Sequence, residues 1–513
     1  MFRNPIAAIL SVGALALMGC APQSGGGGGG DEGPAAGEQG GACLAGGTCN
    51  EALVCDEATD TCVAQGAEGE GEGEGEGEGE GEGEGEGEGE GEGEGEGEGD
   101  GSVPAERLQP DDFTYQGAFR LPEDFNWGAR GLSFHPGGDG GAGSLLVTGF
   151  ELVYDPAHAG ESCYDPEWDC YAFYGEVAIP EPAVEANWED LPEAAFLTGM
   201  TAFDGGLVST VHREYIYASD IEYVPQRGTQ TGDKLYGAAS LWYAEGVVGE
   251  DTFPTIWFAN MDGSGAQGMF HVGPEETPYH GRKMGSYLFS VPMWYANQYL
   301  EGRELVTGRA RGTPIGSSDE VTTAGGSQGP TLFAFHALES DTATDDLDAQ
   351  PMLYYRVAFP GCAGPNVGIP ANCDYPEYTM CDDWTGGAFV DDGSRRAIML
   401  LGYKGLGENC YDEPPVDCED PCSDSHGYHC QPYERQVIFY DVHALGHSAR
   451  EQQDPWVVVP YTIWRPAEFY LSGNPCWNAG GMTFDGDDGR LFMVERGLGE
   501  SETNAVVVHV WSL

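Results

Sequence analysis

Four segments of the chain repeat one local pattern: glycine, a short apolar run ending in phenylalanine, a turn rich in aspartate or glycine, and a second apolar run. Such turns between apolar runs favour β-hairpins, because glycine adopts positive φ without a steric penalty. A hairpin that recurs along a chain points to a fold made of repeated antiparallel units. The segments are GLSFHPGGDGGAGSLLVTG (131–149), GMTAFDGGLVST (199–210), GGAFVDDGSRRAIMLLG (386–402) and GGMTFDGDDGRLFMVERG (480–497).

The length of the region that holds these repeats favours a propeller. Four-stranded propeller blades take about 40–50 residues, and more when loops are long. The first two aligned phenylalanines, Phe134 and Phe203, are 69 residues apart. Residues 103–513 therefore predict an all-β fold, a single β-propeller of five to seven blades, about six, with a β-sandwich as the alternative. We expect the last segment, AVVVHVWSL, to close the ring by pairing with DFTYQGAFRL (112–121).

Helical patterns are scarce in this region. VPMWYANQYLEGREL (291–305) is the best candidate for a short helix. RQVIFYDVHAL (435–445) is rich in β-branched and aromatic residues, so we expect a strand there.

The N-terminus has the features of an export signal. Arg3 precedes an apolar run over 6–18, which is too short to span a bilayer. The run ends in Leu-Met-Gly-Cys, which resembles the lipobox of bacterial lipoproteins. The resemblance implies a signal peptide over 1–19, lipid on Cys20 that anchors the chain in a membrane, and an outer-membrane address, since Ala21 replaces the aspartate of inner-membrane retention. We expect a cell-envelope protein, surface-exposed or periplasmic-facing; an ordinary secretory signal is the alternative.

Three segments separate the signal from the body. Residues 20–42 are glycine-rich and predict a disordered tether. Residues 43–62 carry four cysteines and resemble the small cysteine-rich stalk modules of secreted bacterial proteins and, more loosely, Dickkopf-like or EGF-like knots. Residues 63–102 contain an uninterrupted Glu-Gly repeat, which predicts a disordered linker kept extended by charge repulsion.

The net charge of −65 excludes some partners. The linker accounts for only part of it, because residues 103–513 hold 62 acidic against 20 basic residues. A field of this sign repels nucleic acid, so we expect no nucleic-acid partner.

The cysteines predict disulfides. Fourteen remain after Cys20, in two even-numbered sets, and exported proteins meet an oxidising environment. Four of them fall in an acidic, proline-containing insertion around 408–430, whose C-x7-C-x3-C-x7-C spacing matches no zinc pattern, although His426 and His429 lie beside it. We expect a disulfide-stapled loop there rather than a metal site. The predicted disulfide cysteines are Cys43, Cys49, Cys55, Cys62, Cys163, Cys170, Cys362, Cys373, Cys381, Cys410, Cys418, Cys422, Cys430 and Cys476.

Two groups of side chains are candidate binding sites. A basic island stands out in the acidic body and could bind an anionic ligand, or simply neutralise neighbouring acids; it comprises His280, Arg282, Arg303, Arg309 and Arg311. The turn at 485–489 offers oxygen ligands for calcium, the one cofactor we consider, or is an ordinary aspartate-rich turn; its acids are Asp485, Asp487 and Asp488.

No catalytic residue is assigned, since the chain has no phosphate-binding loop and no H-E-x-x-H motif. The first functional hypothesis is therefore a surface-displayed, lipid-anchored binding protein that presents a propeller face to an extracellular carbohydrate or protein. The alternative is a carbohydrate-active propeller enzyme, a glycoside hydrolase or lyase, acting on an anionic glycan. Fold alone does not decide between them.

Overall fold

The computed structural model forms two compact units, Met1–Glu98 and Gly99–Leu513. In the first, the described residues are β1 (Leu53–Asp56) and β2 (Thr61–Ala64), an antiparallel pair with Cys55 opposite Cys62. In the second, the structure describes residues 106–513 apart from 151–170, 212–215, 242–253, 275–283, 311–329, 343–345, 356–374, 376–377, 380, 413–416, 423–426, 474–475, 477–478 and 500–502.

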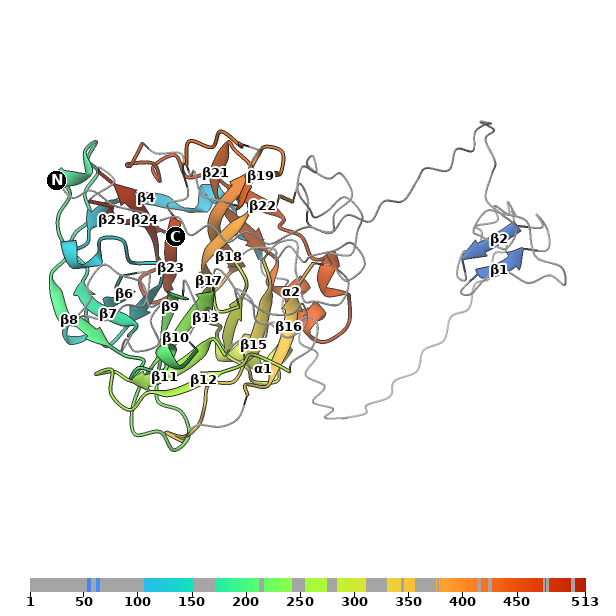
Figure 1. Ribbon diagram of the computed structural model, residues 1–513. Coiled ribbons are helices and arrows are strands. Elements are labelled where there is room, and N and C mark those ends of the chain that lie inside the picture. Colours follow the sequence, from blue (N-terminus) through green and yellow to red (C-terminus); the bar gives the residue numbers. More distant parts are fainter. Residues whose placement is uncertain are drawn as a thin grey trace, which may run out of the picture. The chain divides into compact units, whose positions relative to one another are not determined.

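The second unit is a five-bladed β-propeller (Figure 1). Each blade is an antiparallel sheet with four main strands, which confirms the predicted fold class; five is the lower end of the predicted range. Strands are given from the axis outward. The first blade consists of β5 (Leu132–His135), β6 (Ser144–Thr148), β7 (Phe173–Ala178) and β8 (Phe196–Ala202), and the second of β9 (Ile216–Val224), β10 (Lys234–Leu241), β11 (Ile256–Asn260) and β12 (Gln267–Phe270). The third consists of β13 (Tyr287–Ser290), β14 (Leu305–Gly308), β15 (Leu332–Phe335) and β16 (Ala349–Leu353), the fourth of β17 (Asp383–Asp391), β18 (Arg395–Gly405), β21 (Tyr433–Tyr440) and β22 (Thr462–Trp464), and the fifth of β23 (Ala479–Asp485), β24 (Arg490–Leu498), β25 (Ala505–Ser512) and β4 (Thr114–Arg120).

The two ends of the unit share the fifth blade. Strand β25 lies between β24 and β4, and Val508 is in register with Phe119. The ring is therefore closed by hydrogen bonds between the last strand and the first long one, as the sequence predicts. A short strand, β3 (Glu106–Arg107), pairs in parallel with β18 on the fourth blade.

Three of the four repeated segments are the innermost hairpins of blades. Phe134, Phe389 and Phe484 lie on the inner strands β5, β17 and β23. Phe203 does not: it follows β8, the outermost strand of its blade, and its carbonyl accepts a hydrogen bond from Trp257 Nε1 at 3.1 Å. The 69-residue spacing was therefore not a blade length, which is why it gave about six blades instead of five.

Buried carboxylates join the inner strands of neighbouring blades. Asp220 on β9 accepts hydrogen bonds from the backbone N–H of Leu132 on β5 at 3.1 Å and of Leu288 on β13 at 2.7 Å. Two residues along the same strand, Glu222 accepts from Ser133 Oγ at 2.8 Å and from the Ser290 N–H at 2.9 Å. One strand thus ties three blades together at the axis.

The fifth blade is attached to the first by similar means. Thr483 Oγ1 on β23 accepts from the Phe134 N–H at 3.1 Å. Gly481, on the same strand, runs so close to β5 that a Cβ would lie 2.5 Å from the backbone nitrogen of Leu132. Glycine inside a strand commonly marks such an approach, which explains the glycine of the repeat.

Two short α-helices are described. Helix α1 (Met293–Tyr299) lies within the segment predicted to be helical. Helix α2 (Val442–Ala449) corrects the prediction of a strand over 435–445: β21 ends at Tyr440, and the Asp441 carboxylate caps the helix by accepting the Ala444 N–H at 2.9 Å. In the described part of the chain, neither helix nor any other is long and apolar enough to cross a membrane.

The axial carboxylates predict a specific pH dependence. Burial raises the pKa of Glu222 to about 7 from an ordinary 4.5. The folded protein then holds a proton that the unfolded chain releases, so this residue's contribution to stability is full below pH 4.5 and is lost as the pH rises toward 7. Glu222→Gln cannot lose a proton, and should unfold with a stability that declines less between pH 5 and pH 8.

The measurement is urea unfolding of both proteins at pH 5 and pH 8. We expect the variant to gain about 1–3 kcal/mol on the wild type between the two conditions. Glu339→Gln, at an exposed carboxylate, is the control. Parallel pH profiles for wild type and Glu222→Gln would contradict the account.

Candidate ligand-binding site

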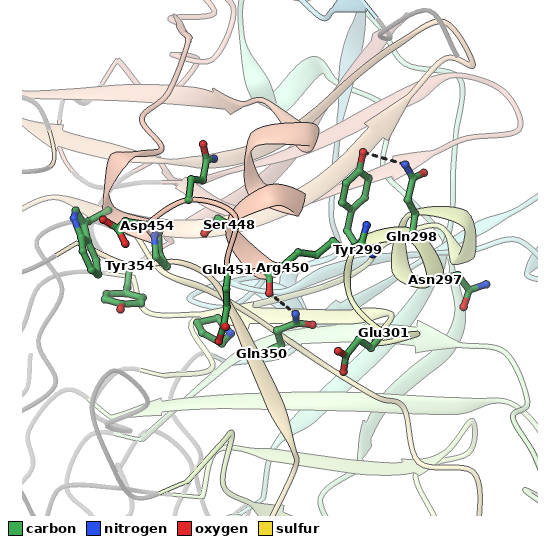
Figure 2. A pocket seen from close by; sticks show the side chains of 15 residues that line it. Asn297, Gln298, Tyr299, Glu301, Gln350, Tyr354, Ser448, Arg450, Glu451 and Asp454 are labelled. Carbon is green, nitrogen blue, oxygen red and sulfur yellow. Dashed lines mark hydrogen bonds between the residues drawn. The ribbon is translucent and has the colours of Figure 1, made fainter. Parts of the chain in front are cut away.

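A cleft of about 660 Å³ opens between the third and fourth blades (Figure 2). It lies where the C-terminal ends of α1 and α2 meet the outermost strand β16 and the short 3-10 helix η7 (Pro455–Val457). We call it the α1–α2 cleft. Its lining residues are Asn297, Gln298, Tyr299, Glu301, Gln350, Pro351, Tyr354, Ser448, Ala449, Arg450, Glu451, Gln453, Asp454, Pro455 and Trp456.

Three contacts fix the two helices against each other. Tyr295 Oη donates to the Val442 carbonyl at 2.8 Å, and the Tyr299 hydroxyl lies 2.8 Å from His443 Nδ1. Gly446 faces the Tyr299 ring so closely that a Cβ would lie 2.4 Å from it. The cleft wall therefore depends on a glycine and two tyrosines from segments about 150 residues apart in sequence.

Side-chain contacts also connect the residues at the floor of the cleft. The Gln350 side-chain amide on β16 donates to the Ala449 carbonyl at the end of α2, a bond drawn in Figure 2. Arg303 donates to Gln350 Oε1 at 3.4 Å and is itself paired with Glu301 at 3.0 Å and with Asp348. This chain of contacts joins the two blades below the opening.

The lining combines amides with an aromatic edge. Asn297 and Gln298 on α1 are exposed and carry both donors and acceptors. Tyr354 and Trp456 are half-buried and meet edge-to-face, with ring centroids 5.7 Å apart. An apolar ring face beside a few placed polar groups is the usual make-up of a small-molecule site.

Charges in the cleft favour a neutral or basic ligand. Glu301, Glu451 and Asp454 line it, against the single cation Arg450. An anionic ligand would meet a net negative surface there.

The structure separates the two members of the basic island that it describes. Arg303 precedes β14 and Arg309 follows it, so the two lie at opposite ends of that strand. Arg303 is paired with acids, whereas Arg309 is buried, and its burial lowers its pKa to about 10. His280, Arg282 and Arg311 lie outside the described residues.

The candidate calcium ligands lie in the hairpin turn between β23 and β24. Asp485 accepts the backbone N–H of Asp487 at 3.1 Å and pairs with Arg490 at 2.7 Å. Asp488 also lies 3.1 Å from Arg490. Within the described ranges, no three His, Cys, Asp or Glu side chains are grouped as metal ligands would be.

Three of the predicted disulfides are formed in the described part of the chain. Cys410 pairs with Cys418 inside the acidic insertion, Cys430 with Cys381 before β17, and Cys422 with Cys476 before β23. The insertion is thus stapled to the fourth and fifth blades. His429 bonds to Asp420 at 2.8 Å. The side chains of Cys55 and Cys62 are not described, and Cys43, Cys49, Cys163, Cys170, Cys362 and Cys373 lie outside the described residues.

Sequence reasoning missed the α1–α2 cleft altogether. Its residues come from three segments, 297–301, 350–354 and 448–456, and no spacing within one segment signals the site. Comparison with known proteins adds no family: no protein-family model matches the chain, and no curated protein matches its sequence.

The close packing of α1 on α2 gives a direct test of the cleft's construction. Gly446→Ala would force the Tyr299 ring away from α2, which should cost about 1–3 kcal/mol of the free energy of unfolding. Urea unfolding measures it. Gly232→Ala is the matched control, because a Cβ at Gly232 meets no atom within 4 Å. Equal stability of the two variants would show that α1 and α2 do not pack as described.

Proposed function

We propose that this protein is a lipid-anchored, surface-displayed binding protein whose propeller takes a carbohydrate in the α1–α2 cleft. The observation that carries the proposal is that one cleft is lined both by exposed amides, Asn297 and Gln298, and by the contacting aromatic rings of Tyr354 and Trp456. Amides match the hydroxyl groups of a sugar as both donors and acceptors, and an aromatic face packs against its C–H surface.

The cleft favours neutral or amino sugars over acidic ones. Its three carboxylates outnumber Arg450, and nearby Arg303 is already paired with Glu301 and Asp348. This differs from the anionic glycan of the alternative hypothesis. The rigid frame of α1, α2 and β16 also suits binding, because a preformed site loses little entropy when a ligand is ordered.

Trp456→Ala tests the cleft. Screening the full-length chain on a glycan array should identify neutral or amino-sugar ligands, and the variant should bind them about tenfold or more weakly, since it loses the stacking face. Trp294→Ala, which removes another exposed tryptophan, should bind like the wild type. Equal loss in both variants, or none in Trp456→Ala, would contradict the proposal, and cleavage of a bound glycan would replace it with the enzyme alternative.

The anchor has its own test. Cys20→Ser removes the thiol that the lipobox resemblance assigns to lipid, so the exported chain should move from the detergent phase to the aqueous phase in phase partitioning. Substitution of Cys62, in the stalk, should leave the partition unchanged. Retention of Cys20→Ser in the detergent phase would contradict lipid attachment at this residue.

A further inference from the structure

A second cavity, of about 410 Å³, lies at the C-terminal ends of the five inner strands. We call it the axial cavity, because all five blades line it. Each inner strand contributes one aromatic residue to its lining: Phe134, Tyr223, Phe289, Phe389 and Phe484. Phe289 and Phe389 are 4 % and 7 % exposed, so these two present only the edges of their rings. Three of the five are the repeated phenylalanines of the sequence, so the repeat builds an aromatic collar around the axis.

The axial cavity also contains a buried carboxylate with no cationic partner among the described residues. Glu222 is 8 % exposed, and its hydrogen bonds come from Ser133 and Ser290, which are both neutral donors. A buried carboxylate is normally paired with a cation, because leaving it unpaired is costly. Because burial raises the pKa of Glu222 to about 7, the residue carries an unpaired negative charge only above that pH.

The remaining charges of the lining do not supply a cationic partner for Glu222. Arg227 is the one arginine among the lining residues, and it pairs with Glu304 at 3.2 Å. Asp485 is paired with Arg490, and Asp487 adds an exposed carboxylate at the rim. Four carboxylates thus line the cavity with one guanidinium.

We propose that the axial cavity binds an alkylammonium group, held by the aromatic collar and by the charge of Glu222. Aromatic faces attract ammonium ions through their quadrupoles, and alkylated ammonium groups are recognised by cages of aromatic side chains. The same chemistry occurs on free alkylammonium compounds and on lysine side chains of proteins. A monoatomic cation gains less from the collar, because it has no apolar body to pack against the rings.

This inference is independent of the carbohydrate proposal, although α1 takes part in both sites. Met293 at the start of the helix lines the axial cavity, while Asn297 and Gln298 near its end line the α1–α2 cleft. The two lists of lining residues share no member. Each site can therefore be disabled alone.

The experiment is calorimetric titration of the full-length chain, at pH 8 where Glu222 is ionised, with choline and with its neutral isostere, 3,3-dimethyl-1-butanol, at constant ionic strength. Choline should bind about tenfold or more tightly than the alcohol. Nα-acetyl-lysine methylamide is the second probe and tells whether a lysine side chain is accepted as well as a free compound. If it binds as tightly as choline, the natural source is a protein side chain or a small molecule; if it fails, it is a small molecule.

Two variants locate the site. Glu222→Gln keeps the side-chain shape and removes the charge, and Phe484→Leu keeps an apolar side chain and removes the ring; each should weaken choline binding at least about fivefold. Trp456→Ala should leave it unchanged, which separates this result from the carbohydrate proposal. Circular dichroism and unfolding curves establish that the variants are folded. Equal binding of choline and its isostere, or unchanged choline binding in both folded axial variants, would overturn the inference.

Discussion

The hydrogen bonds between the inner strands of neighbouring blades, around the propeller axis, are the constraint on which the rest of this structure depends. Strands of one blade bond along a ladder, but no such ladder links the inner strands of neighbouring blades. Side-chain hydrogen bonds connect these strands: Asp220 and Glu222 on β9 accept from β5 and β13, and Thr483 on β23 accepts from β5. Buried carboxylates are costly unless hydrogen-bonded, so the loss of any of these bonds should destabilise the ring. The axial cavity and its aromatic collar exist because the inner strands are held at this spacing.

The acidity of the chain gives its few cations a structural role. Lys234 and Lys404, two of the three lysines, are buried in ion pairs with Asp341 and Asp382. Arg435 is buried against Glu495 at 2.9 Å. Breaking such a pair would leave an uncompensated charge in the interior, which is strongly destabilising, so each cation stays paired with its acid. Described basic side chains thus serve mainly to neutralise acids, and the ligand recognition that we propose in the two cavities rests on amides, aromatic rings and carboxylates.

The sequence predicts the propeller because its repeats have physical causes that act locally. The repeated glycine permits close approach at the axis, as Gly481 shows, and the repeated phenylalanine sits at the end of an inner strand. Ring closure by the last strand follows from the same pattern. The five blades lie within the predicted five to seven. The central value of about six was too high because Phe203 matches the motif although it follows an outer strand. Helix α2 was missed although its capping residue, Asp441, can be seen in the sequence. The apolar run of β21 continues almost directly into the helix, so the point at which the strand ends could not be recognised.

The two proposed binding sites could not be predicted in this way. The α1–α2 cleft needs β16 and the ends of two helices to meet, and the axial cavity takes side chains from every blade. The cleft leaves no spacing that can be counted along the chain. The axial cavity includes three phenylalanines of the visible repeat, but the repeat does not show that they line a cavity. By contrast, the disulfides of the acidic insertion were predictable as a class from the even number of cysteines and the expectation of export. Two of its cysteines pair with Cys381 and Cys476, which lie outside the insertion.

The most direct test of the functional account is a crystal structure of the protein with a bound oligosaccharide taken from the glycan array. The account predicts a sugar ring packed on Trp456 and hydroxyl groups within hydrogen-bond distance of Asn297, Gln298 or Gln350. Sugar density elsewhere on the propeller, with the α1–α2 cleft empty, would contradict it.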